Sequence, residues 1–94
     1  MIIGMDNAEK ILARMRQTKH GWKPRDFKRL YTGFGFVLEE STKHTTYIHD
    51  EYGIITQVAR HRKLAPSYAD DAVRFVDQVK ARIQQAQDDN PDDI

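Results

Sequence analysis

The sequence predicts a single α+β domain in which helices cover one face of a three-stranded antiparallel sheet. Three observations support this fold class: apolar residues at helical spacing near both ends of the 94-residue chain, three short β-branched and aromatic segments between them, and short connections that only antiparallel strands allow. A chain of this length has room for one core between two layers. We expect residues 1–87 to form the domain and the aspartate-rich residues 88–94 to be a disordered acidic tail.

Two helices are expected in the first third of the chain. Asp6 or Asn7 can cap a helix that ends near Gln17, and its apolar residues follow helical spacing: Ala8, Ile11, Leu12 and Met15. Pro24 suits the first turn of a second helix, where a missing N–H costs nothing. Gly33 is expected to end that helix.

Three strands and a final helix follow. Residues 34–39, 44–49 and 54–59 have the composition of strands, and residues 50–53 that of a turn. We expect His49 to belong to this turn because it precedes Asp50. Pro66 opens the last helix, whose apolar face is expected to comprise Tyr68, Ala72, Phe75, Val76, Val79 and Ile83.

Charge is distributed unevenly along a chain whose net charge is only +1. Residues 10–63 contain twelve basic and five acidic residues, whereas residues 64–94 contain three basic and seven acidic ones. A basic body with an acidic end suits a polyanion ligand, although a solvated surface explains the charges equally well. The chain has no cysteine, so disulfides and thiolate zinc sites are excluded. With no apolar run of membrane-spanning length and no evident signal peptide, we expect a cytoplasmic protein without a membrane partner.

His44 is the leading candidate for chemistry. It lies in the run Thr42–Tyr47, and histidine ordinarily exchanges protons near neutral pH. Because side chains alternate along a strand, Thr42 should share the face of His44, while Lys43 should point to the other face. Taken alone, a strand histidine is more often a polar surface residue than a catalytic group. His44 and His49 have no carboxylate or cysteine cluster with them, so we expect no metal site and no cofactor.

A second candidate lies after the third strand. His61 and Arg62 could return to the neighbourhood of the second strand and supply another proton-transfer group or a phosphate clamp. The expected RNA-binding residues are all basic: Lys43, Arg60, His61, Arg62 and Lys63.

The chain resembles the HicA toxins of bacterial toxin–antitoxin systems, which have a double-stranded-RNA-binding-like fold. Over roughly residues 6–83, three runs carry the resemblance: Gly33–Phe36, then Ser41–Tyr47, then residues 58–66. That family carries a Gly-Ser-x-His motif where this chain has Ser41, Thr42, Lys43 and His44. Threonine keeps the hydroxyl of the family's serine, but serine in place of glycine would strain the backbone if that position needs a positive φ.

The resemblance implies a metal-independent endoribonuclease, an mRNA interferase neutralised by a HicB-type antitoxin protein. His44 would act as acid or base, and the Thr42 hydroxyl would hold phosphate oxygens. Two other readings of the same fold stay open: a non-catalytic RNA-binding module, which needs the basic face but not His44, and a protein-binding module, which needs neither.

Overall fold

The elements follow one another in the predicted order of two helices, three strands and one helix. The computed structural model describes residues 3–88 and has these elements: α1 (Ile3–Gln17), α2 (Pro24–Gly33), β1 (Val37–Glu40), β2 (His44–His49), β3 (Ile54–Ala59) and α3 (Pro66–Asp88). The α+β fold class is confirmed. α1 begins at Ile3, so Asp6 and Asn7 lie inside the helix and neither is its N-cap. α3 continues through Asp88, and the rest of the predicted tail lies outside the described residues.

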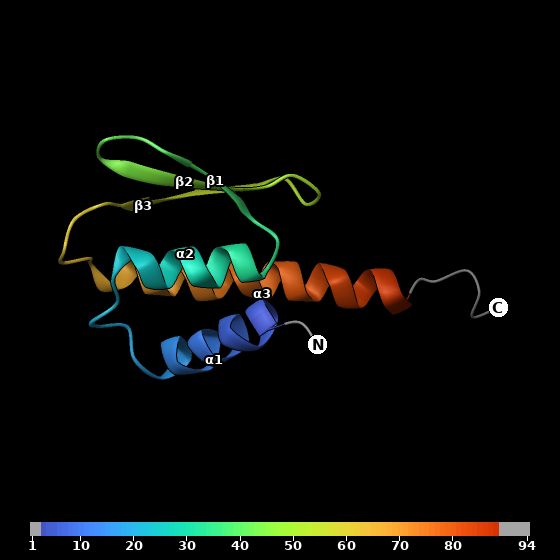
Figure 1. Cartoon of the computed structure of the whole chain (residues 1–94). Coiled ribbons are helices and arrows are strands. Elements are labelled where there is room, and N and C mark those ends of the chain that lie inside the picture. Colours follow the sequence, from blue (N-terminus) through green and yellow to red (C-terminus); the bar gives the residue numbers. More distant parts are fainter. Residues whose placement is uncertain (1–2, 89–94) are drawn as a thin grey trace.

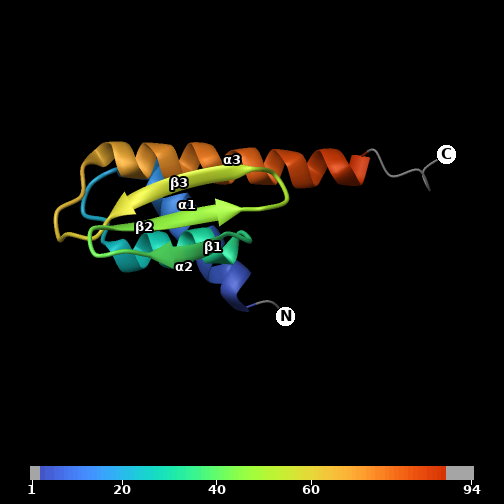
Figure 2. The ribbon, with the colours of Figure 1, turned by 90° about the horizontal axis from the view of Figure 1, so that it is seen from above.

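The sheet is an antiparallel meander with the order β1-β2-β3, so β2 lies at its centre. All the helices lie on one side of the sheet (Figure 1). α2 and α3 run beneath the strands, and α1 packs against them on the side away from the sheet. Seen from above, the opposite face of the sheet is left uncovered (Figure 2).

Strand alternation in β2 sets which side chains face the helices. Thr45, Tyr47 and His49 are buried, whereas His44 is exposed on the opposite face. β2 pairs with β3 in a register that places His44 opposite Ala59. The fold therefore presents His44 on the uncovered face, at the end of the sheet where β2 begins and β3 ends.

Tyr31 of α2 is the centre of the core. Its ring stacks on Tyr47 of β2, with centroids 4.5 Å apart, and meets the ring of Phe36 edge-on at 4.9 Å. Such pairs contribute beyond the area that they bury, by about 0.5–1.5 kcal/mol each. Burial raises the pKa of Tyr47 to about 12 and also raises the pKa of Tyr31, so both phenols stay neutral.

α2 ends at Gly33, as predicted, and Gly35 turns the chain out of the helix. The N–H of Gly35 donates to the Thr32 carbonyl at 3.2 Å and that of Phe36 to the Tyr31 carbonyl at 3.1 Å. With Gly35 at φ +93°, this is a Schellman motif, and the Tyr31–Phe36 contact is the apolar contact that accompanies it. Because the chain is still completing the helix end at Phe36, β1 begins at Val37 rather than at Phe34.

His49 is a core residue and not the turn residue expected from the sequence. It ends β2 with 7% of its surface exposed, stacks on Tyr52 at 4.8 Å and meets Phe36 edge-on at 5.1 Å. A Cβ added at Gly35 would lie 3.1 Å from its Nε2 atom. Gly35 thus both turns the chain out of the helix and makes room for the His49 ring.

The apolar face of α3 is shorter than predicted. Ala72, Val76 and Val79 are fully buried, but Ile83 is 40% exposed. The helix extends past the end of α2 and the sheet, so its last turns have no layer to pack against (Figure 2). Ala69, which the sequence analysis passed over, is buried instead.

An ion pair connects α1 to α3. The Arg16 guanidinium donates to both carboxylate oxygens of Asp77, at 2.5 and 2.8 Å. This bond lowers the pKa of Asp77, so the contribution of the pair is present above the ordinary aspartate pKa and is lost as the pH falls through the lowered value. Both side chains are more than two-fifths exposed, so the pair stabilises the fold by about 0.2–1 kcal/mol.

Across residues 3–88, no helix combines the length and the apolar character that crossing a membrane requires.

We predict that Gly35→Ala destabilises the protein by about 2–3 kcal/mol, because alanine is strained at positive φ and its methyl group would also press on His49. Gly53→Ala is the matched control: Gly53 has φ +67° but open space around it, so we expect a loss of about 1 kcal/mol. Urea unfolding curves measure both changes. Equal losses in the two variants would contradict the close packing of Gly35 on His49.

Candidate active site

Two chain segments meet at the end of the sheet that carries His44. One is the turn from β1 to β2, and the other is the exit of β3 toward α3 (Figure 2). The Arg60 N–H donates to the Lys43 carbonyl at 2.9 Å, which extends the pairing of β2 and β3 by one step. The residues after β3 are thereby held beside the turn that precedes His44.

The Arg60 side chain strengthens the same junction. Its guanidinium donates to the carbonyl oxygen of Ser41, a bond that bridges nineteen positions of the chain. Arg60 was predicted to bind RNA, and part of its hydrogen-bonding capacity serves the turn. The remaining N–H groups of the guanidinium can still meet a phosphate.

Ser41 shapes the turn without backbone strain. It does not have a positive φ, so a serine fits this backbone. The Ser41 N–H donates to the His44 carbonyl at 2.8 Å, and its hydroxyl accepts the His44 N–H at 3.2 Å. These bonds fix the backbone on both sides of Thr42 and Lys43.

A hollow of 360 Å³, which we call the His44 pocket, unites most of the candidate residues. Its lining comprises Thr42, Lys43, His44, Ala59, Arg60, His61 and Tyr68. Lys43 lines the same hollow as His44, although strict strand alternation would put the two residues on opposite faces. Strand alternation does not extend to Lys43, which lies in the turn before β2 begins.

His61 lies in the His44 pocket, as its place after the third strand suggested. Its Nδ1 atom is 2.9 Å from the Lys63 carbonyl oxygen. A carbonyl can only accept, so Nδ1 carries the hydrogen, and in the neutral ring Nε2 is left as an acceptor. His61 therefore has a fixed orientation and one nitrogen available for proton transfer.

Tyr68 belongs to the pocket although the sequence analysis placed it in the core. It is half-buried in the first turn of α3, close to the exit of β3. The sequence contained an indication of this position. Tyr68 comes two residues after Pro66, and the start of α3 must return to the end of the sheet that carries His44.

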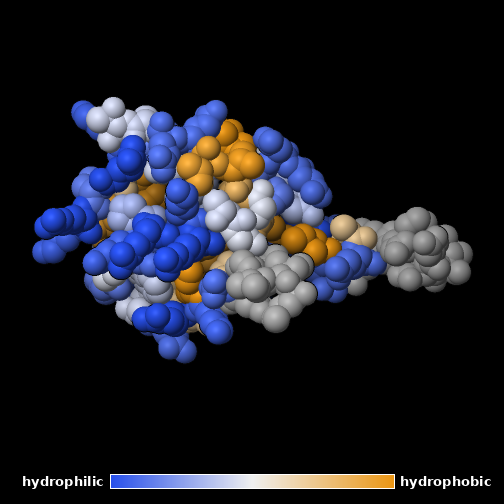
Figure 3. Space-filling model, viewed as in Figure 1, coloured by the Kyte–Doolittle hydropathy of each residue, from blue (hydrophilic) through white to orange (hydrophobic). Residues whose placement is uncertain are grey.

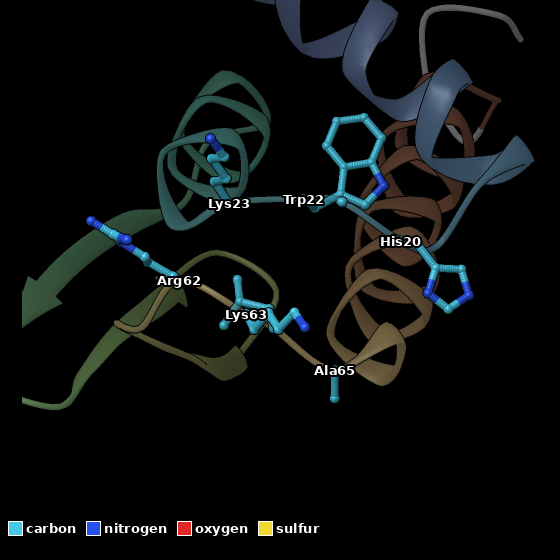
Figure 4. Close-up of a pocket in the computed structure, with 8 residues that line it drawn as sticks. His20, Trp22, Lys23, Arg62, Lys63 and Ala65 are labelled. Carbon is cyan, nitrogen blue, oxygen red and sulfur yellow. The ribbon is translucent and has the colours of Figure 1, made fainter.

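Arg62 and Lys63 lie outside the His44 pocket. Both line a neighbouring hollow between the α1–α2 and β3–α3 connections (Figure 4). Among residues 3–88, no three histidine, aspartate or glutamate side chains gather closely enough to hold a metal ion. The residues that line the His44 pocket carry two imidazoles, two hydroxyls and two basic groups.

Comparisons of the chain with protein-family models, with curated proteins and with solved structures give no match.

We predict that Arg60→Ala loosens the turn between Ser41 and His44, because the Ser41 carbonyl loses its guanidinium donor. The exchange of the Ser41 amide hydrogen with solvent, measured by NMR, should accelerate about tenfold, which corresponds to the roughly 1.4 kcal/mol expected for a charge-assisted bond. Arg62→Ala removes the same charge nearby and serves as the control. Unchanged exchange in Arg60→Ala would show that the turn holds without the side chain.

Proposed function

We propose that this protein is a metal-independent endoribonuclease that cleaves mRNA through the two histidines of the His44 pocket. The observation that carries the proposal is that His44 and His61, from segments separated along the chain, line one small hollow together with basic side chains. Two imidazoles set among cations suit the cleavage of a phosphodiester.

The reaction that these groups support is a transesterification within the RNA. One imidazole removes the proton of the 2′-hydroxyl, and the 2′-oxygen then attacks the adjacent phosphorus. The bond from phosphorus to the 5′-oxygen breaks, and the second imidazole, as imidazolium, gives that oxygen its proton. The products are a 2′,3′-cyclic phosphate and a 5′-hydroxyl, so atoms and charge balance without a metal ion.

The other side chains of the pocket would stabilise the charge that develops on the phosphate. Lys43, the free N–H groups of Arg60 and the Thr42 hydroxyl are donors from the turn and from the β3 exit. The hydrogen bonds of Ser41 and Arg60 fix the backbone of the turn that carries Thr42 and Lys43 before the substrate arrives. Such preorganisation is what makes electrostatic stabilisation effective.

The protein partner that we propose is a HicB-type antitoxin bound over the uncovered sheet face. Val37, Ile48 and Ile55 are paired side by side across the three strands, and we call them the apolar row. Val37 is 55% and Ile55 67% exposed, so the row forms an exposed apolar patch of the kind that marks protein interaction sites. An apolar area is visible on the sheet layer at the top of Figure 3. A partner on this row would also cover His44 on the same face.

As an mRNA-directed toxin, the protein would act in the cytoplasm.

We predict that His44→Ala and His61→Ala each lower the cleavage of a short RNA transcript by about 10²–10⁴-fold, the usual contribution of a general acid or base. The assay contains a chelator, and the product ends are tested for the 2′,3′-cyclic phosphate. Gln57→Ala, on the same sheet face but outside the pocket, is the matched control and should stay within about twofold of the parent.

Partial recovery of His44→Ala by added imidazole would separate a chemical role from a structural one. If both histidine variants cleave RNA at the parental rate, the endoribonuclease proposal is wrong. If the parent binds RNA without cleaving it, the non-catalytic RNA-binding module is the correct reading.

We predict that Ile55→Lys weakens binding of the proposed HicB-type antitoxin by about tenfold or more, because a charge would be buried in the apolar row. Ile83→Lys is the matched control, since Ile83 is an exposed isoleucine on α3, away from the sheet. Co-purification and calorimetry measure the effect. Equal binding by both variants would place the partner elsewhere.

A further inference from the structure

The His44 pocket is one of three hollows that adjoin one another at this end of the molecule. Beside it lies a hollow of 480 Å³, the Arg62 pocket, lined by Lys23, Pro24, Arg60, His61 and Arg62. Beyond that lies one of 540 Å³, the Trp22 pocket, formed between the α1–α2 connection and the β3–α3 connection.

Shared lining residues make each hollow the direct neighbour of the next. Arg60 and His61 line both the His44 pocket and the Arg62 pocket, and Lys23 and Arg62 line both the Arg62 pocket and the Trp22 pocket. We call the whole path from His44 to Trp22 the basic track. In Figure 4 the residues around its far end come from two facing segments, with Trp22 and Lys23 on one and Arg62 and Lys63 on the other.

The lining of the basic track carries positive charge only. Five lysine and arginine residues and three histidines line its hollows, and no aspartate or glutamate does: Lys23, Lys43, Arg60, Arg62, Lys63, His20, His44 and His61. A hollow against α3 differs, because Asp70 and Asp77 line it beside Lys19 and Arg74. Hydrophilic residues cover the track's end of the molecule in Figure 3. A row of cations without a carboxylate in the lining attracts a phosphate backbone.

The Trp22 pocket adds an apolar surface to this charge. Trp22, Leu64 and Ala65 contribute to its lining, between Lys23 on one side and Arg62 and Lys63 on the other. The Trp22 indole N–H donates to the Thr18 carbonyl at 2.9 Å, and Arg14 lies 5.7 Å from the ring centroid, so the half-buried ring is held in place. A held aromatic residue and apolar neighbours beside cations offer an unpaired base a place next to phosphate-binding groups.

We propose that the basic track binds an extended single strand of RNA, with the cleaved phosphodiester at His44 and a base of the same strand in the Trp22 pocket. The proposal rests on the proposed function for the identity of the ligand, and it defines the substrate class as single-stranded. Bases within a duplex are stacked on one another and cannot enter an apolar pocket. The connection between α1 and α2 thereby becomes part of the substrate site, as the wall of the track opposite Arg62 and Lys63.

The test is a binding measurement in the His44→Ala background, which prevents cleavage during the assay. Fluorescence anisotropy measures the affinity of the protein for three labelled RNAs: oligouridine of three nucleotides, oligouridine of twelve nucleotides, and a duplex of twelve base pairs. We expect the twelve-nucleotide strand to bind at least about tenfold more tightly than the three-nucleotide strand, because only the longer one reaches the Trp22 pocket.

Paired substitutions locate the contact. Lys23→Gln with Arg62→Gln should weaken binding of the twelve-nucleotide strand by about tenfold and reduce the slope of log affinity against log salt by about 1–2. Lys10→Gln with Arg82→Gln removes the same charge outside all three hollows and is the matched control. Trp22→Phe, which keeps an aromatic ring in the pocket, should weaken binding less than Trp22→Ala.

Three results would overturn the proposal: equal affinity for the two strand lengths, equal losses in the two charge pairs, or tighter binding of the duplex. These outcomes are independent of the catalytic proposal. Length-dependent binding can be present even if His44 does not cleave RNA, and cleavage of the short strand can persist even if the track does not bind the long one.

Discussion

The stacking of Tyr31 on Tyr47 is the contact on which the rest of the structure depends. It fixes α2 against the central strand and determines which face of β2 looks inward. Once Tyr47 is buried, alternation places His44 on the open face, because the two residues differ by an odd number of positions. A slip of one residue would bury the imidazole and expose the tyrosine, so the packing of the core also specifies the orientation of the candidate catalytic group.

Electrostatics divide the molecule in a way that the net charge conceals. The acidic side chains of α3 and α1 are partly matched within the helical layer, where Arg16 pairs with Asp77, Lys80 with Glu9, and Arg74 with Asp71. The cations around the His44 pocket and the basic track face no carboxylate in the lining of those hollows. The end of the sheet is therefore suited to receive an anion, and Arg60 combines this role with holding the turn.

Much of the fold follows from short-range patterns in the sequence, which is why β2, β3 and the start of α2 at Pro24 were predicted with the observed bounds. The errors arose where tertiary packing decides. The first strand was expected from Phe34 but begins at Val37, because Gly35 has the positive φ that completes the helix end. Ile83 continues a helical pattern beyond the layer that could bury it. In the site, the proximity of His44 and His61 was predicted. The places of Lys43 and Tyr68 in the same pocket were not, because they depend on the shape of the turn before β2 and on where α3 begins.

The turn between β2 and β3 lies at the opposite end of the sheet from His44 (Figure 2). Asp50 and Glu51 are exposed, and Gly53 has open space around its Cα atom. The strand pairing that positions the two histidines is fixed by the buried residues between this turn and the pocket. The protein thus has one end of its sheet where chain length can vary during evolution, and where a peptide or a label can be inserted, while the chemical groups at the other end keep their spacing.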